Sequence, residues 1–170
     1  MKYKTIILAA LLLAGAAFLF FNLSGDKDGG KERTSPGFEV EDAASGRRLS
    51  SSDLKNKVIF VNFWASWCQP CKEEMSSIEA LYREMSSNSN FIMVTILYKD
   101  SPENAFRYMK SMGYTFPVYV DPGGGAARNY GVTGVPETYI TNKRGLLAVR
   151  VIGPADWDAP GEKKRIKTLF

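Results

Sequence analysis

The chain has 170 residues, of which 45% are hydrophobic, and it carries a formal net charge of +4, two cysteines and no histidine. This length and apolar fraction allow one globular domain with additional segments. The absence of histidine excludes Ser-His-Asp and Cys-His catalytic sites, His-containing zinc or copper sites, and CxxCH haem attachment.

Residues 1–23 are predicted to form a targeting segment, either a cleaved signal peptide or a retained signal anchor. Lys2 and Lys4 precede an apolar run over residues 6–21 that contains no charged side chain. At about 1.5 Å per residue the run is slightly short for a bilayer core. Residues 18–21 nevertheless continue it beyond a possible cleavage site, so we favour the anchor. The lysines predict a single-pass orientation with the rest of the chain outside the cytoplasm.

Residues 24–37 are predicted to be a flexible linker because they are polar and rich in glycine. The folded domain is expected to span residues 38–170. Its first residues, 38–41, alternate like an edge strand, and residues 45–49 turn the chain back. We therefore expect an N-terminal β-hairpin extension ahead of the main sheet.

The stretch 58–85 carries the chemistry of the chain. Residues 58–63 form an apolar run interrupted only by Asn62, which predicts a buried strand. Both cysteines, Cys68 and Cys71, come next, and from Cys71 onward the pattern is that of an amphipathic helix. The expected inner stripe is Cys71, Met75, Ile78, Leu81, Tyr82 and Met85, and the expected outer face is Lys72, Glu73, Ser76, Ser77, Arg83 and Glu84.

A cysteine pair at the start of a helix predicts redox chemistry. Unpaired backbone N–H groups and the helix dipole stabilise a thiolate, so Cys68 should have a lowered pKa and act as the attacking sulfur. Cys71 lies one turn further on, along the inner stripe, which suits a resolving thiol. Pro70 is tolerated because N–H groups in the first turn lack partners in any case. Two thiolates are only half of a tetrahedral zinc site, so we expect no metal, and no cofactor besides a redox-active Cys68–Cys71 disulfide.

Glu74 is the unexpected residue of this helix. It follows Cys71 by three residues and adjoins Met75, so its carboxylate is expected at the edge of the apolar stripe. Loss of solvation there should raise its pKa and let it exchange protons with the Cys68–Cys71 pair. The alternative is an ordinary helix-surface glutamate near the positive end of the dipole.

The segment FWASWCQPCK, residues 63–72, resembles the active-site segment of the thioredoxin superfamily. Within it, the chain is most similar to the membrane-anchored, extracytoplasmic thiol-disulfide oxidoreductases of the TlpA, ResA and CcmG (DsbE) type. Those proteins also carry a glutamate at the position of Glu74, whereas cytoplasmic thioredoxins have a buried aspartate where this chain has Asn62. The resemblance covers residues 38–152 and implies a thioredoxin-like α/β fold, with a central mixed β-sheet flanked by helices.

The remaining elements are expected to complete that sheet. Alternation of buried strands with helices predicts parallel core strands joined by right-handed crossovers. Methionines at helical spacing are interpreted as core residues and not as copper ligands. The expected strands are 91–98, 118–121, 138–141 and 146–152, and the expected helices are 101–112, 126–130 and 162–170. The inner stripe of the helix 101–112 is expected to be Ala105, Phe106, Met109 and Met112.

Residues 134–138, GVPET, are the second functional element. A proline just before a strand cannot donate to the ladder, so by itself it indicates an edge or a bend, with a trans or a cis bond. In thioredoxin-fold proteins a proline at this place has a cis peptide bond and stands beside the dithiol. Free backbone groups there can pair with an extended substrate strand. The resemblance therefore implies a client-binding surface made of Trp67, Gln69, Pro70, Val135 and Pro136.

The sequence thus predicts a thioredoxin-like protein-disulfide oxidoreductase outside the cytoplasmic membrane. Gln69–Pro70 lacks the histidine of strongly oxidising relatives, so the resemblance implies a reductant of client disulfides such as those of apocytochrome c, recharged by a membrane thiol donor. Two alternatives stay open: a disulfide-forming oxidant or isomerase, and a redox-inactive binding module in which the Cys68–Cys71 bond is structural. A peroxiredoxin is disfavoured because its peroxidatic cysteine lacks the WCxPC arrangement. The basic residues 163–167 are interpreted as a solvated helix face and not as a nucleic-acid site.

Overall fold

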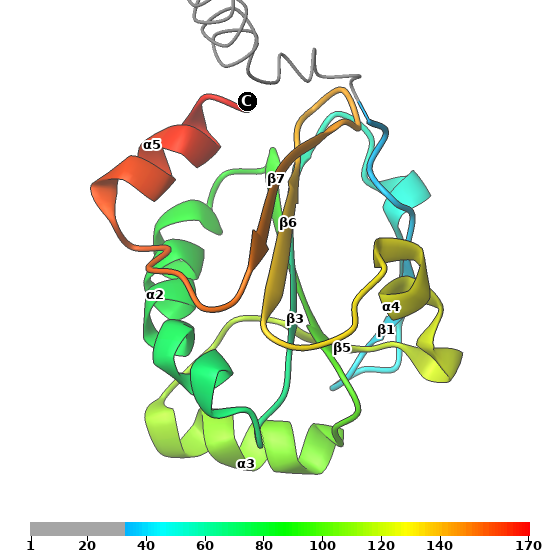
Figure 1. Ribbon diagram of the computed structural model, residues 1–170, viewed down its shortest axis with the longest axis vertical. Coiled ribbons are helices and arrows are strands. Elements are labelled where there is room, and N and C mark those ends of the chain that lie inside the picture. Colours follow the sequence, from blue (N-terminus) through cyan, green and yellow to red (C-terminus); the bar gives the residue numbers. More distant parts are fainter. Residues whose placement is uncertain (1–32) are drawn as a thin grey trace, which may run out of the picture. The chain divides into compact units, whose positions relative to one another are not determined.

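A computed structural model describes residues 33–170 and places a mixed β-sheet at their centre, with the strand order β2-β1-β5-β4-β3-β6-β7 (Figure 1). The pairs β3–β4 and β4–β5 are parallel, and the other neighbours are antiparallel. The strands are β1 (Glu39–Asp42), β2 (Arg48–Ser50), β3 (Val58–Trp64), β4 (Phe91–Leu97), β5 (Val118–Val120), β6 (Glu137–Thr141) and β7 (Leu147–Ile152). The helices are α2 (Gln69–Met85), α3 (Pro102–Met112), α4 (Gly125–Tyr130) and α5 (Pro160–Lys167), with short 3-10 turns at η1 (Ser51–Asp53) and η2 (Pro122–Gly124).

Strand β3 is the centre of the sheet, and all of its residues are buried. It pairs in parallel with β4 along its whole length and antiparallel with β6. Because successive side chains of a strand point to opposite faces, Phe60 and Trp64 pack into one hydrophobic cluster, whereas Val61 and Phe63 pack into another. The sheet therefore separates two cores.

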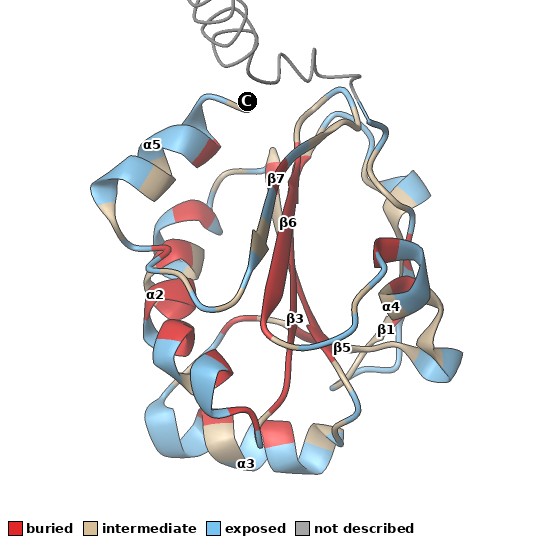
Figure 2. Ribbon diagram, viewed as in Figure 1, coloured by how far each residue is buried: buried red, intermediate tan, exposed pale blue. Residues whose placement is uncertain are grey.

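Helices cover both faces of the sheet. Met75 of α2, Met109 of α3 and Ile166 of α5 belong to the cluster on one face, and Ala126 of α4 belongs to the cluster on the other. Buried residues gather in the sheet and on the sides of the helices that face it (Figure 2). This arrangement is the α/β layering with a mixed sheet that the sequence predicts.

Most of the predicted inner stripe of α2 is buried, and Glu74, Ser77 and Glu79 are buried as well. Ser77 was expected on the outer face, and that prediction was wrong. Its Oγ accepts the N–H of Trp157 at 3.0 Å, because the segment before α5 lies against this side of α2. Glu79 is also buried, at 5% exposure. Tyr82, expected inside, is half-buried.

Helix α3 keeps only part of its predicted inner stripe. Ala105 and Met109 are buried, whereas Phe106 and Met112 are 37% and 52% exposed, so the prediction that these two belong to the core was wrong. Ala105 and Met109 are separated by four residues and lie on one line of the helix. The helix meets the sheet along that line, and side chains to either side of it reach solvent.

The N-terminal part of the domain differs from expectation in two ways. Strand β1 pairs antiparallel with β2 on one side and with β5 on the other, so β1 is internal and β2 is the edge of the sheet. The prediction of an edge strand at residues 38–41 was therefore wrong. In addition, the N–H of Ser35 donates to the carbonyl of Gly145 at 2.9 Å, which attaches the end of the predicted linker to the turn between β6 and β7.

The predicted signal anchor, and the predicted linker up to residue 32, lie outside the described residues. Within residues 33–170, none of the helices combines the length and the apolar character needed to cross a membrane.

Candidate active site

Cys68 and Cys71 lie where the central strand passes into α2. Cys68 is the N-cap of α2, and the two sulfurs form a disulfide with the Cα atoms 5.3 Å apart. The N–H of Cys71 donates to Sγ of Cys68 at 3.1 Å, so an unpaired helix-terminal donor is directed at that sulfur. Cys68 is 5% exposed and Cys71 is fully buried. Of the two sulfurs, Cys68 is thus the one that solvent and the helix N-terminus both reach.

The loop before the disulfide is held by the segment that follows β4. Asp100 Oδ2 accepts the N–H of Ser66 at 2.6 Å, and the carbonyl of Lys99 accepts Nε1–H of Trp67 at 3.1 Å. Lys99 has a positive φ of 50°, which is uncommon for a residue with a side chain. Sequence reasoning missed Lys99 and Asp100, since they are distant in the chain and belong to no motif.

The two predicted motifs meet at Cys68. The Val135–Pro136 peptide bond is cis, as the resemblance implies, and Sγ of Cys68 lies 3.5 Å from the carbonyl oxygen of Val135. Gln69 and Pro70 are exposed beside the disulfide. The structure therefore brings together the predicted nucleophile, the cis-proline loop and the residues predicted to contact a client.

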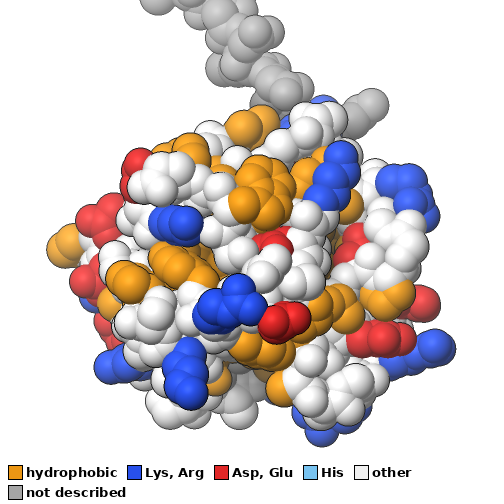
Figure 3. Space-filling model, turned by 90° about the horizontal axis from the view of Figure 1, so that it is seen from below, with side chains coloured by type: hydrophobic (Ala, Val, Ile, Leu, Met, Phe, Trp, Pro, Cys, Tyr) orange, Lys and Arg blue, Asp and Glu red, His pale blue; other side chains and the backbone are white. Residues whose placement is uncertain are grey.

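Trp67 is 58% exposed next to this disulfide, although it is large and apolar. The end of the domain at which α2 begins is seen in Figure 3, where apolar side chains reach the surface between Lys/Arg and Asp/Glu groups. Exposed aromatic side chains beside a reactive group are typical of a surface that binds another protein.

A buried carboxylate holds the cis-proline loop. Glu137, 2% exposed, accepts the N–H of Thr133 at 3.3 Å through Oε1. Its Oε2 accepts the hydroxyl of Tyr139 at 2.6 Å and pairs with Arg150 at 3.3 Å. These contacts fix the start of β6, and with it the carbonyl of Val135.

Glu74 is 1% exposed, and its carboxylate accepts three hydrogen bonds. Nδ2–H of Asn62 donates to Oε1 at 2.9 Å, whereas the N–H of Ala155 (3.1 Å) and Nε1–H of Trp157 (3.2 Å) donate to Oε2. Burial raises the pKa of Glu74 to about 7, because desolvation outweighs these three hydrogen bonds, each of which favours the charged form. The predicted burial and raised pKa of Glu74 are confirmed, and the helix-surface alternative is wrong.

Asn62 connects this carboxylate to the cis-proline strand. Its Nδ2 also donates to Oγ1 of Thr138 at 2.9 Å, and Thr138 lies two residues after Pro136. The sequence singled out Asn62 only as a replacement for the aspartate of thioredoxins. The link to Thr138 forms because β3 and β6 are neighbours with Asn62 opposite Thr138.

The site holds the groups that thiol-disulfide exchange uses. They are a sulfur that accepts a helix-terminal N–H, a second, buried sulfur, and a carboxyl group with a pKa of about 7. Within residues 33–170, no group of three or more Cys, Asp or Glu side chains is arranged to hold a metal ion.

Comparisons with known proteins point to the same chemistry. A family model described as the AhpC/TSA family matches residues 32–150. The thiol-disulfide oxidoreductase ResA of Bacillus subtilis (strain 168) is 32% identical over 157 residues, which are 89% of this chain and 87% of ResA. The thiol:disulfide interchange protein CycY of Rhizobium leguminosarum bv. viciae is 33% identical over 124 residues, which are 70% of this chain and 64% of CycY. The structure of a thiol:disulfide interchange protein of the thioredoxin family from Chlorobium tepidum TLS matches with a TM-score of 0.68 at 25% identity, covering 82% of this chain and 97% of that one.

Proposed function

The chain belongs to the AhpC/TSA family of thioredoxin-like proteins and is a thiol-disulfide oxidoreductase, and we propose that it reduces disulfides of specific client proteins outside the cytoplasmic membrane. The observation that carries the proposal is the position of Sγ of Cys68, which accepts the N–H of Cys71 and lies 3.5 Å from the carbonyl of Val135. A sulfur placed there is activated by the helix and adjoins the backbone that a client strand would pair with.

Cys68 is the nucleophile in the proposed cycle. In the reduced enzyme its thiolate attacks one sulfur of a client disulfide, the client S–S bond breaks, and the second client sulfur leaves as a thiolate that takes up a proton. Cys71 then loses its proton and attacks Sγ of Cys68, which breaks the mixed disulfide and releases the first client sulfur as a thiol after protonation. The client gains two electrons and two protons, and the enzyme ends with the Cys68–Cys71 disulfide.

Glu74 moves the proton of the buried thiol in this proposal. Cys71 is fully buried, so water reaches its thiol poorly when it must ionise. Glu74 lies one helical turn further along α2 with a pKa of about 7, so it can accept that proton and return it near neutral pH. Its substitution by glutamine should slow the second step, in which Cys71 attacks, more than the first.

The direction of the reaction is proposed from the residues between the cysteines. Gln69–Pro70 supplies no cationic side chain to stabilise the Cys68 thiolate further, and the whole chain contains no histidine. A less stabilised thiolate makes the reduced form a stronger reductant. Equilibration with glutathione redox buffers tests this point. A potential near the about −270 mV of thioredoxin supports a reductant, whereas one near about −120 mV would establish an oxidant.

The location is proposed from the N-terminal segment. Lys2 and Lys4 ahead of the apolar run at residues 6–21 support a signal anchor that leaves the catalytic domain outside the cytoplasm. There a membrane thiol donor would re-reduce it. Protease added to intact cells and to spheroplasts tests this topology, because only an extracytoplasmic domain is digested while the cytoplasm stays closed.

The clients are proposed to be proteins with exposed disulfides, with apocytochrome c as the example that the resemblance to the ResA and CcmG type implies. A Cys71→Ser variant cannot resolve the mixed disulfide, so clients should stay attached to Cys68 and be identifiable by mass spectrometry. A Cys68→Ser variant is the matched control and should capture none. Equal capture by the two variants, or none by either, would support the redox-inactive module instead.

A further inference from the structure

The carboxylate of Glu74 is held mainly by a segment that lies far from it in the chain. Two of its three hydrogen bonds come from the N–H of Ala155 and Nε1–H of Trp157, in the connection between β7 and α5. Trp157 is fully buried, and its ring meets that of Phe60 edge to face at 5.0 Å between centroids. This segment belongs neither to the cysteine motif nor to the cis-proline loop, and it contains none of the residues predicted to contact a client.

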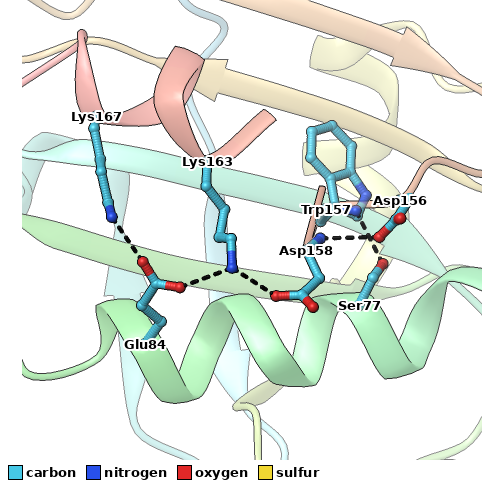
Figure 4. Close-up of polar contacts among 7 residues, drawn as sticks. All are labelled: Ser77, Glu84, Asp156, Trp157, Asp158, Lys163 and Lys167. Atoms are coloured by element: carbon cyan, nitrogen blue, oxygen red, sulfur yellow. Dashed lines mark hydrogen bonds and ion pairs between the residues drawn. The ribbon is translucent and has the colours of Figure 1, made fainter. Parts of the chain in front are cut away.

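The same segment is anchored to α2 by a second set of contacts. Oγ of Ser77 accepts the N–H of Trp157 at 3.0 Å and donates to the carbonyl of Glu74 at 2.8 Å. Beyond it, Lys163 of α5 pairs with Asp158 (2.8 Å) and with Glu84 of α2 (3.0 Å). Lys167 completes a ladder of ion pairs by bonding Glu84 at 2.7 Å (Figure 4).

We propose that Trp157 is a positioning residue for Glu74. The segment between β7 and α5 places the Trp157 indole against the carboxylate, and the ion pairs between α5 and α2 hold that segment in place. This inference rests on the proton-transfer role proposed for Glu74. The indole N–H is a single directed donor in a buried site, so it favours the ionised carboxylate and fixes where Oε2 lies. The indole N–H of Trp157 is donated to Oε2 of Glu74, so its proposed effect on the site runs through that carboxylate.

Few groups other than these donors could change the pKa of Glu74. Asn62 from β3, and Ala155 and Trp157 from the C-terminal segment, are uncharged donors. On α2, the Cys71 thiol, once reduced, lies one turn before Glu74, and the carboxylate of Glu79, five residues after Glu74, is engaged by Arg83 and Thr115. From α5, Lys163 faces Glu84 and Asp158. Burial and these three donors account for the titration of Glu74.

The test is an NMR titration of the Glu74 carboxyl carbon, which gives the pH midpoint at which this group loses its proton. The sample is the full chain in detergent micelles with carbon-13-labelled glutamate, and Glu74→Gln assigns the signal. Trp157→Phe retains an aromatic ring but loses the indole N–H, so the midpoint should rise by about one pH unit. Phe60→Leu is the matched control: it removes the ring contact with Trp157 but no hydrogen bond, and its midpoint should stay at the wild-type value.

A second variant keeps the test decisive if Trp157→Phe does not fold. Ser77→Ala removes the acceptor of the backbone N–H of Trp157 but leaves the indole intact. It should raise the midpoint of the Glu74 titration by a smaller amount than Trp157→Phe does. An unchanged midpoint in the variants that fold, or an equal shift in Phe60→Leu, would overturn the proposal. The titration needs no client and no redox partner, so its failure is distinct from a redox potential or trapping result that contradicts the proposed function.

Discussion

Glu74 and Glu79 lie on the same helix, both with buried side chains, and their pKa values move in opposite directions. Desolvation raises the pKa of both. For Glu74 it prevails over three uncharged donors. For Glu79 it is outweighed by the N–H and hydroxyl of Thr115, by the Arg83 guanidinium and by the N–H of Phe116. One carboxyl group is therefore free to change its proton near neutral pH, and the other is fixed as an anion that ties α2 to the segment before β5.

Glu74→Gln should change how stability depends on pH. The pKa of Glu74 is raised from 4.5 to about 7 in the folded protein, so the folded state binds the proton more tightly than the unfolded state. The resulting stabilisation is complete below the unfolded pKa and is lost as pH rises through the folded one. At about 1.4 kcal/mol per pH unit, wild type should lose on the order of 3 kcal/mol relative to Glu74→Gln between about pH 4 and pH 8. Urea unfolding of the two proteins across that range measures the difference, and parallel curves would contradict it.

Glu79→Ala should show the opposite sign. The pKa of Glu79 is lowered, so its contribution is present above the unfolded value of 4.5 and is lost as pH falls through the folded pKa. The substitution leaves the buried N–H of Phe116 and the partly buried N–H of Thr115 without an acceptor, which should cost about 2–4 kcal/mol at neutral pH. Urea unfolding at neutral and acid pH should show this gap narrowing in acid, while the rate at which Cys68 is alkylated stays at the wild-type value. A gap of the same size in acid would show that the carboxylate charge is not what stabilises this contact.

Trp67→Ala should weaken client reduction without destabilising the domain. The Trp67 side chain is 58% exposed and makes one hydrogen bond, to the carbonyl of Lys99, so removing it should change the free energy of unfolding by less than about 1 kcal/mol. Because the ring lies beside Cys68, the rate of reaction with a protein disulfide should fall several-fold, whereas the rate with a small disulfide should hardly change. Met112→Ala removes a similarly exposed apolar side chain from α3 and serves as the control. Equal rates for both variants with the protein substrate would exclude a contact between Trp67 and clients.

Local patterns were sufficient for the elements that carry the chemistry. The buried run before the cysteines, the helix that begins at Gln69, and the edge position of Glu74 all follow from side-chain periodicity within one stretch of chain. The cis bond before Pro136 follows only from the resemblance, since a proline ahead of a strand is compatible with either isomer.

Contacts between distant segments were beyond the reach of those patterns. Ser77 has the spacing of an exposed residue, and it is buried because the segment that contains Trp157 folds over it. Asp100 accepts the N–H of Ser66, and it lies in a loop that has no recognisable sequence motif. Phe106 shows the opposite error, since it was predicted to be buried and is exposed. Periodicity shows that a helix has an apolar side, but not how much of that side the sheet covers.

The central claim is that Cys68 is a nucleophile activated by its place at the start of α2. The most direct measurement is the pH dependence of iodoacetamide alkylation of Cys68 in Cys71→Ser, where no second thiol competes. The account predicts a midpoint at least about one pH unit below the usual thiol pKa of about 8.5. A midpoint at or above that value would contradict it, because it would show that the helix N-terminus does not stabilise the thiolate.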